Sequence, residues 1–222
     1  MKHLKNCMPV MAVLLFTITG PALAGQEDLP EVTVEGLHRV PDSRLSVVYA
    51  DPEANLASYH RVLLLDAYVA FRKNWERDQR SAANPLRVTS RDVEEIKNRL
   101  SGEFESVFRS TLEKAGYQLT DEPGDDVLLV RPAIINLDVN APDTPRTGRT
   151  KSYTSSAGEM TLYIELYDSV TGDLIAKALD RKVDNQAYYT WSNSVTNKKA
   201  ADKILQGWAS ILVEALDEAR QP

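Results

Sequence analysis

The stretch that decides the fold is Gly158–Val183, which reads GEMTLYIELYDSVTGDLIAKALDRKV. In its first half every second residue is aliphatic, at Met160, Leu162, Ile164 and Leu166. The residues between them are polar or aromatic, so the pattern predicts a half-buried antiparallel strand with one apolar face. A polar segment then ends in a glycine able to adopt positive φ, which predicts a turn before the chain returns. The stretch is therefore predicted to form a β-hairpin.

Three further segments are predicted to be strands. Leu45–Tyr49 is short and is followed by an Asp-Pro pair, which takes the chain out of a ladder. Tyr59–Phe71 has the nearly continuous apolar centre Val62–Leu65, which predicts a central strand buried on both faces. Val127–Val139 contains Pro132, which cannot donate a ladder hydrogen bond, so we expect a bulge or a sheet edge there.

Two segments show helical periodicity. Thr89–Asp92 is an approximate capping box, with a hydroxyl and a carboxylate three residues apart, and Gly116 is the expected terminator. The first apolar stripe between these signals comprises Val93, Ile96, Leu100, Phe104, Val107, Phe108, Leu112 and Ala115. The second stripe comprises Ala201, Ile204, Leu205, Trp208, Ile211, Leu212, Ala215, Leu216 and Ala219. Both stripes require a large apolar surface to pack against.

The sheet is the only apolar surface large enough to bury both helices. We therefore predict a single α+β domain over residues 45–222, with a mainly antiparallel sheet and two amphipathic helices packed on one face. Residues 25–44 mix charges, prolines and isolated apolar residues. They are interpreted as an N-terminal lead-in that could dock as a strand through Val32, Val34 and Leu37. The segment 141–157, rich in Pro, Gly, Ser and Thr, is predicted to be a loop between strands.

Residues 1–24 have the pattern of a secretory signal peptide. Two lysines precede the apolar run Met8–Ile18, and Ala22–Ala24 forms a small-x-small cleavage signal. A transmembrane anchor would need about 20 apolar residues, whereas proline, threonine and glycine interrupt this run. We expect cleavage between Ala24 and Gly25, no transmembrane segment in the mature chain, and a periplasmic location.

Composition excludes several classes of function. Removal of Lys2 and Lys5 with the leader takes the formal net charge from −6 to −8, which disfavours nucleic acid as a partner. The only cysteine is Cys7, so the mature chain can form no disulfide and has no lipid-attachment cysteine behind the apolar run. We expect a core that is stabilised by burial alone.

Few residues carry recognisable chemistry. His38 and His60 have no partner at metal-ligand spacing, and there is no nucleophile elbow, so we expect no metal, no cofactor and no catalytic residue. Asp138 and Glu165 could face each other on neighbouring strands, which would suit glycoside cleavage. Carboxylates on a solvated sheet face are nevertheless common in an acidic protein, and we favour that interpretation.

Four aromatic residues are the candidate binding residues. Trp75 is the one aromatic residue in the polar segment 72–87 and either binds a partner or pins this segment to the body, which is the favoured interpretation. Tyr188, Tyr189 and Trp191 precede the last helix and could stack on sugar rings or on an apolar patch of a partner. Packing of these rings at the helix entrance is the commoner arrangement.

Several segments resemble a bacterial family of lipoproteins filed as domain of unknown function 3313. They are 49–52, 59–62, 156–158, 165–172 and the return strand to Asp180-Arg181. The resemblance extends from about Leu45 to Leu216. It implies a cell-envelope location and a protein that is not an enzyme, and it assigns no site residue. The chain differs from the family in lacking the lipid-attachment cysteine.

Three hypotheses of function follow. The first is a non-enzymatic binding or assembly module that engages an envelope protein or glycan through its sheet edge or through the aromatic residues before the last helix. The second is an envelope glycan hydrolase that uses carboxylates on the sheet. The third is a homo-oligomeric structural protein that pairs through the Pro132 strand or the hairpin edge.

Overall fold

The structure is a computed structural model that describes residues 29–79, 88–139, 152–192 and 194–220. The chain separates into two units, Met1–Pro30 and Glu31–Pro222, and the fold below is that of the second unit. The predicted signal peptide and its cleavage site between Ala24 and Gly25 lie outside the described residues.

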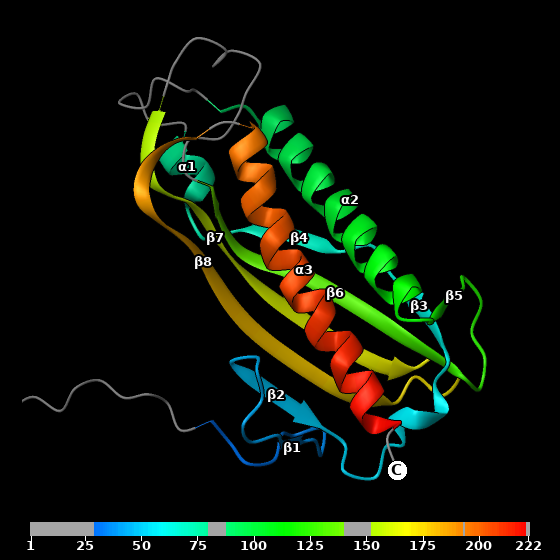
Figure 1. Ribbon diagram of the computed structural model, residues 1–222. Coiled ribbons are helices and arrows are strands. Elements are labelled where there is room, and N and C mark those ends of the chain that lie inside the picture. The colour runs from blue at the N-terminus through cyan, green and yellow to red at the C-terminus, as the bar shows by residue number, and fades with distance from the viewer. Residues whose placement is uncertain (1–28, 80–87, 140–151, 193, 221–222) are drawn as a thin grey trace, which may run out of the picture. The chain divides into compact units, whose positions relative to one another are not determined.

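The second unit is an α+β domain, as predicted (Figure 1). Its strands are β1 His38–Arg39, β2 Val47–Ala50, β3 Arg61–Leu64, β4 Tyr68–Phe71, β5 Gln118–Leu119, β6 Val127–Val139, β7 Ser152–Asp168 and β8 Leu174–Ser192. Its helices are the short α1 Trp75–Gln79, the long α2 Ser90–Lys114 and the long α3 Ser194–Ala219, with a 3₁₀ turn at Leu56–Ser58. Among the described helices, none is long and apolar enough to cross a membrane.

The strands form one mixed sheet in the order β1-β2-β8-β7-β6-β3-β5, with β4 also paired to β6. The pairs β1–β2, β2–β8, β6–β7 and β7–β8 are antiparallel, whereas β3 and β4 pair with β6 in parallel, as β3 does with β5. The long hairpin β7–β8 lies in the middle of the sheet. The prediction of a mainly antiparallel sheet is confirmed.

The hairpin predicted from the alternating pattern is present, and its turn is built as expected. Asp168 accepts hydrogen bonds of 2.8 Å from the backbone N–H groups of Val170 and Thr171, and Gly172 has a φ of +73°. The hairpin is longer than predicted, because β7 begins at Ser152. The loop prediction for 141–157 is therefore wrong for residues 152–157, and residues 140–151 lie outside the described part of the chain.

The predicted strand Tyr59–Phe71 is two strands, and neither is buried on both faces. β3 buries Val62 and Leu64 but leaves Leu63 half-buried, and the chain leaves the sheet before β4 begins. Pro132 lies in β6 opposite this break, between the pairs Leu64–Val130 and Tyr68–Ala133. A proline is tolerated there because no neighbouring strand requires its missing N–H.

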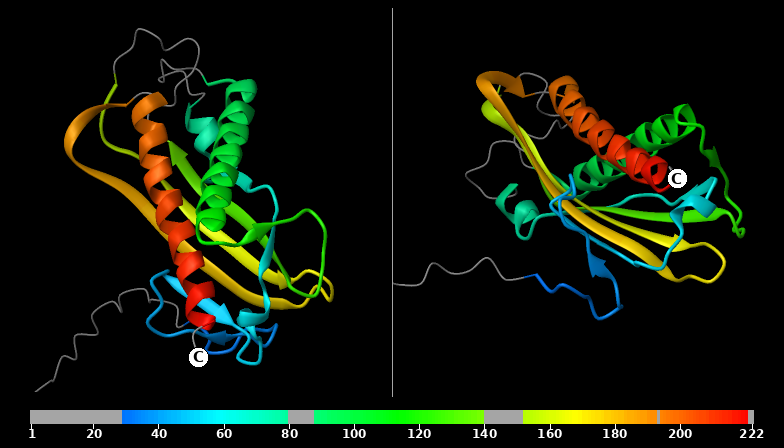
Figure 2. Two further views of the ribbon diagram at one scale, coloured as in Figure 1. Left: turned by 45° about the vertical axis from the view of Figure 1, so that its right-hand side comes forward. Right: turned by 60° about the horizontal axis from the view of Figure 1, so that its bottom comes forward.

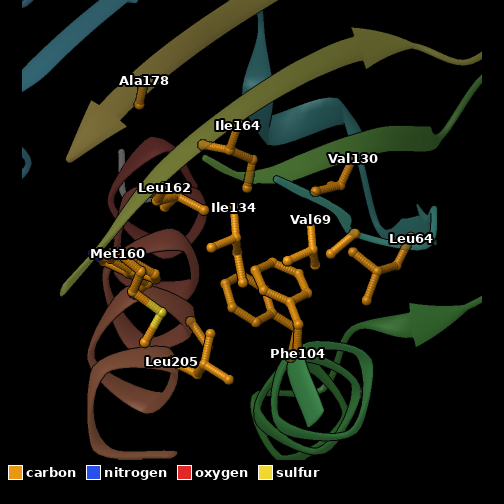
Figure 3. Close-up of a cluster of buried hydrophobic side chains, with 14 of the residues drawn as sticks. Leu64, Val69, Phe104, Val130, Ile134, Met160, Leu162, Ile164, Ala178 and Leu205 are labelled. Carbon is orange, nitrogen blue, oxygen red and sulfur yellow. The ribbon is translucent and has the colours of Figure 1, made fainter. Parts of the chain in front are cut away.

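The two long helices cover one face of the sheet (Figure 2). α2 begins as predicted: Thr89 is the N-cap, and it exchanges hydrogen bonds with Asp92 in a capping box. Figure 3 shows side chains of the sheet pointing at Phe104 of α2 and Leu205 of α3, both fully buried. The buried face of β7 is the aliphatic series that the sequence predicts, Met160, Leu162, Ile164 and Leu166.

The lead-in packs only in part. Within it, Leu37 is buried, whereas Val34 is fully exposed and Val32 is 46% exposed. β1 pairs with β2, and the tight turn before it is closed by a hydrogen bond of 2.9 Å from the Thr33 N–H to the Leu37 carbonyl. The lead-in thus docks through Leu37 and β1 and leaves Val34 exposed.

Candidate functional site

The face of the sheet opposite α2 and α3 carries the candidate site, and we call it the outer face. Its residues alternate with the buried ones along each strand, so each residue and its cross-strand partners form rows across the sheet. An uncharged row comprises Tyr68, Ala133, Tyr163, Leu179 and Val47. The next row, called the charged row, comprises Arg131, Glu165, Lys177, Tyr49 and Arg39. Beyond it lies an apolar row of Leu63, Leu129 and Tyr167.

Glu165 is the centre of a hydrogen-bond network on this face. Its side chain accepts a hydrogen bond of 2.6 Å from the Tyr163 hydroxyl and one of 2.7 Å from Nε of Arg131. It is also hydrogen-bonded to Tyr167. The residue is only 7% exposed although it belongs to the outer face. The neighbouring side chains therefore cover the carboxylate.

The network fixes the charge of Glu165. Burial alone would raise the pKa of this carboxyl, but hydrogen bonds from Tyr163, Arg131 and Tyr167 outweigh burial and hold the pKa below its usual range. Burial and the bond to Glu165 raise the pKa of Tyr163 above its ordinary value. Glu165 is thus an ionised structural acceptor at neutral pH, and it has no proton to give to a leaving group.

The remaining charges of the outer face are mostly paired within the chain. Arg131 lies over the ring of Tyr167, 5.2 Å from its centroid, in a cation–π contact. Lys177 forms an ion pair of 2.9 Å with Glu35 of the lead-in, and its hydrogen bond lowers the pKa of that carboxyl to about 2. Arg181 pairs with Glu159.

Apolar side chains are exposed on the same face. Tyr68 and Leu179 stand in the uncharged row with 67% and 36% of their surface exposed. Val183, two residues after Arg181 on β8, is 38% exposed. The outer face therefore combines exposed apolar side chains with charges that are already neutralised.

The proposed carboxylate pair is wrong. Asp138 lies opposite Glu159, whereas Glu165 lies opposite Arg131. The separation along the strand is about six residues, or ~20 Å, far beyond the spacing of glycosidase carboxylates. The prediction failed because β6 carries a bulge between Ile135 and Asp138, and because the register of β6 on β7 was unknown from sequence. Asp138 instead accepts a hydrogen bond of 2.5 Å from Nε of Arg72.

The four aromatic candidates lie in two places. Trp75 is fully buried in α1 and stacks on Phe71, with 3.9 Å between the ring centroids. Its Nε1 donates a hydrogen bond of 3.3 Å to the Val139 carbonyl. It holds the segment to the body and presents no surface to a partner. The strand β8 includes Tyr188, Tyr189 and Trp191, and the backbone of Trp191 pairs with that of Tyr153 on β7. Their side chains lie outside the described ones.

The sequence contains one signal that could have found the outer face. Tyr163, Glu165 and Tyr167 alternate with the aliphatic series of β7, so they must share the opposite face. The contribution of Arg131 depends on the register between β6 and β7, and the pattern of neither strand fixes it alone.

Comparisons with known proteins identify the family. Residues 34–212 match the family described as Protein of unknown function (DUF3313), and the chain belongs to this family. Among curated proteins, none matches the chain.

Several solved structures are similar at low identity. The PelC dodecamer from Paraburkholderia phytofirmans is 14% identical with a TM-score of 0.39, covering 74% of this chain and 95% of that one. Protein XCC0632 from Xanthomonas campestris is 13% identical with a TM-score of 0.40, covering 78% and 90%. A minor lipoprotein from Acinetobacter baumannii is 10% identical with a TM-score of 0.36, covering 74% and 97%. Similarity at this level carries no inference about the function of this chain.

Proposed function

We propose that the protein is a non-enzymatic binding or assembly module of the bacterial cell envelope, and that the outer face of its sheet is the surface that binds. The observation that carries this proposal is the uncharged row, which crosses five strands without a charge and exposes Tyr68 and Leu179. A solvated sheet face normally alternates apolar-in with polar-out. An apolar patch on such a face is typical of an interaction site.

The chemistry of the charged row supports binding over catalysis. A general acid needs a pKa near the working pH, whereas Glu165 is held ionised by three donors. A carboxylate fixed in this way instead orients Tyr163 and Tyr167 on the face before any partner arrives. Rings held in place lose little conformational entropy on binding, which favours affinity.

The envelope location rests on the leader. The lysines, apolar run and Ala22–Ala24 of residues 1–24 suit export with cleavage between Ala24 and Gly25, which would deliver the mature chain to the periplasm. Expression of the full chain followed by intact mass measurement tests this step. We expect the exported protein to begin at Gly25, and recovery of residues 1–24 on the protein would contradict it.

A second candidate contact lies at the end of the hairpin, where Tyr188, Tyr189 and Trp191 fall within four residues of β8. Aromatic residues at these three positions would suit sugar rings or an apolar patch of an envelope protein. Trp191→Ala tests this contact separately from the outer face.

Affinity capture from envelope extract tests the proposed function. The wild-type protein is compared with Tyr68→Glu on the outer face and with Val170→Glu, whose parent side chain is 57% exposed in the β7–β8 turn. We expect a specific envelope component that Tyr68→Glu loses and Val170→Glu keeps, because only the first variant adds a charge to the uncharged row. Equal capture by both variants would exclude the outer face, and loss with Trp191→Ala alone would move the site to the end of the hairpin.

A further inference from the structure

The lead-in lies on part of the outer face. In the right-hand view of Figure 2 it lies on the side of the sheet away from α2 and α3. Arg39 of β1 pairs with Tyr49 of β2, and Tyr49 pairs with Lys177 of β8, so the three share this face. Tyr49 is nevertheless only 6% exposed, Leu37 is 2% exposed, and neither belongs to the hydrophobic core cluster. The lead-in therefore forms a small buried area of its own on the outer face.

An ion pair between Glu35 and Lys177 holds the lead-in on the charged row. The two charged groups lie 2.9 Å apart, and their side chains remain 44% and 20% exposed. Glu35 is also hydrogen-bonded to Thr33 within the lead-in. Burial and Glu165 raise the pKa of Tyr167 on β7, and the charge of Glu35 adds to this shift. The Glu35 carboxylate therefore acts on β7 as well as on β8.

Several hydrogen bonds of the lead-in are made within the lead-in itself, for example the bond of 2.8 Å from the Arg39 N–H to the Glu31 carbonyl. Toward the sheet it makes the two residue pairs of β1 with β2 and a bond of 2.9 Å from the Val40 N–H to the Val48 carbonyl. A segment with few bonds to the body and one partly exposed ion pair opens at a lower free energy than the core. The lead-in can therefore leave the outer face while the domain stays folded.

We propose that residues 31–40 of the lead-in are a releasable strap over Tyr49 and Lys177, and that the partner of the outer face takes the place of this strap. The inference rests on the proposed function, because it adds a regulated part to the same binding surface. Tyr49 and Lys177 lie next to Val47 and Leu179 of the uncharged row, so release of the strap extends the exposed surface by a second row. The strap lowers the affinity for the partner in proportion to the fraction of molecules in which it is open.

The contacts of the strap define what the partner must supply. Lys177 loses Glu35 when the strap lifts, and burial of an unpaired charge beneath a partner is costly. Glu165, which lies opposite Lys177 on β7, already accepts hydrogen bonds from three other side chains. The partner must therefore bring a carboxylate to Lys177 and an apolar side chain in place of Leu37. A segment of an envelope protein with acidic and aliphatic residues meets both requirements.

Two variants of the ion pair separate the strap from the partner, in protein expressed from the full chain. Glu35→Ala and Lys177→Ala remove the same contact, so hydrogen exchange at the Val40 N–H should become about two- to fivefold faster in both. Capture of the envelope component should rise by the same factor in Glu35→Ala, because the open fraction limits the affinity. It should fall below wild type in Lys177→Ala, which also removes the cation that the carboxylate of the partner requires.

Two further variants test the strap alone. Leu37→Ala removes its buried side chain and should increase both exchange at Val40 and capture by at least about tenfold, because truncation of a buried leucine is costly. Glu31→Ala removes an exposed carboxylate from the same strap and is the matched control, which should change neither quantity. Thermal unfolding verifies that each variant is folded.

The results also distinguish failure of the strap from failure of the proposed function. Exchange at Val40 that Leu37→Ala leaves unchanged would show that the strap does not open separately. Faster exchange with unchanged capture in Glu35→Ala and Leu37→Ala would overturn the strap alone, provided that Tyr68→Glu still loses the component. Equal capture by Glu35→Ala and Lys177→Ala would exclude an acidic partner. Capture of no component by any variant or by the wild type would overturn both proposals.

Discussion

At the scale of the residue, Asp180 is a buried carboxylate that joins three parts of the fold. It lies on the helix side of β8, is only 1% exposed, and accepts a hydrogen bond of 2.8 Å from Nε1 of Trp208 in α3. It also accepts a hydrogen bond of 2.6 Å from the Ser46 hydroxyl and forms an ion pair of 2.9 Å with Lys182. These donors depend on the two oxygens of one carboxylate. Asp180 therefore fixes α3 and the start of β2 to the central hairpin.

Substitution of Asp180 should be costly. We expect Asp180→Asn to lower the free energy of unfolding by about 2–4 kcal/mol, because the amide offers one acceptor where the carboxylate offers two and leaves buried donors unsatisfied. Urea unfolding at neutral pH measures the change. Asp173→Asn, in the exposed β7–β8 turn, is the matched control and should have little effect. A stability equal to wild type would show that Asp180 is not a structural link.

The pH dependence of stability follows from the same carboxylates. Burial raises the pKa of Asp180, but its hydrogen bonds from Ser46, Trp208 and Lys182 outweigh burial and lower it, and the pKa of Glu165 is lowered in the same way. A lowered pKa in the folded state contributes stability above the ordinary carboxyl pKa, and this stability is lost as the pH falls through the lowered value. The melting temperature should thus decrease when the pH is lowered below about 4. Asp180→Asn should show a shallower fall, and parallel curves would contradict this assignment.

At the scale of the element, β6 and β7 approach each other closely at Gly158. This residue pairs with Val139 beside the bulge of β6, has a φ of +151°, and leaves no room for a side chain beside the Asp138 carbonyl. Asn136 absorbs the bulge with a φ of +51°, a conformation that asparagine tolerates better than most residues. The bulge returns the buried alternation to register, so that Leu137 faces the core.

Gly158→Ala should therefore destabilise the domain more than a glycine substitution in open space. Its Cβ would overlap the Asp138 carbonyl oxygen, and we expect a loss of about 1–3 kcal/mol from the strained backbone with a further loss from the overlap. Gly116→Ala is the control, since Gly116 has a φ of +90° with no neighbouring atom to contact. Thermal unfolding compares the two. Equal losses would mean that the close approach of the strands costs nothing.

The elements that the sequence predicts well are those with a single clear period. α2 begins at its capping box and the hairpin turns at Gly172, because local hydrogen bonds and φ preferences decide both. The segment Val62–Leu65 is misjudged for a physical reason: Leu63 lies on the outer face, which is itself partly apolar, and Leu65 follows the end of β3 and is exposed. A continuous apolar run normally indicates a strand buried on both faces. Here it indicates a strand with one apolar face that no helix covers.

At the scale of the whole molecule, α+β architecture follows from pattern, whereas the candidate site does not. Two amphipathic helices and an alternating hairpin allow one arrangement of layers, with both helices on one face. The outer face depends on register among β4, β6, β7, β8 and β2, which distant parts of the chain determine together. Tyr163 and Leu179 are both in the predicted hairpin, but nothing in the sequence places Tyr68 of β4 in line with them.

The strand order also determines when the protein can fold. β2, early in the chain, finds its partner in β8, where Val47 pairs with Leu179, and β3 pairs with β6 far beyond it. Any nascent chain that ends before the return strand of the hairpin therefore has no complete sheet on which to build. β2 therefore cannot pair with β8 until the return strand has been made, whereas β3 and β4 find their partner earlier, in β6. A chain with this order cannot complete its sheet while it is being made or threaded through a pore, because β8 lies in its last third.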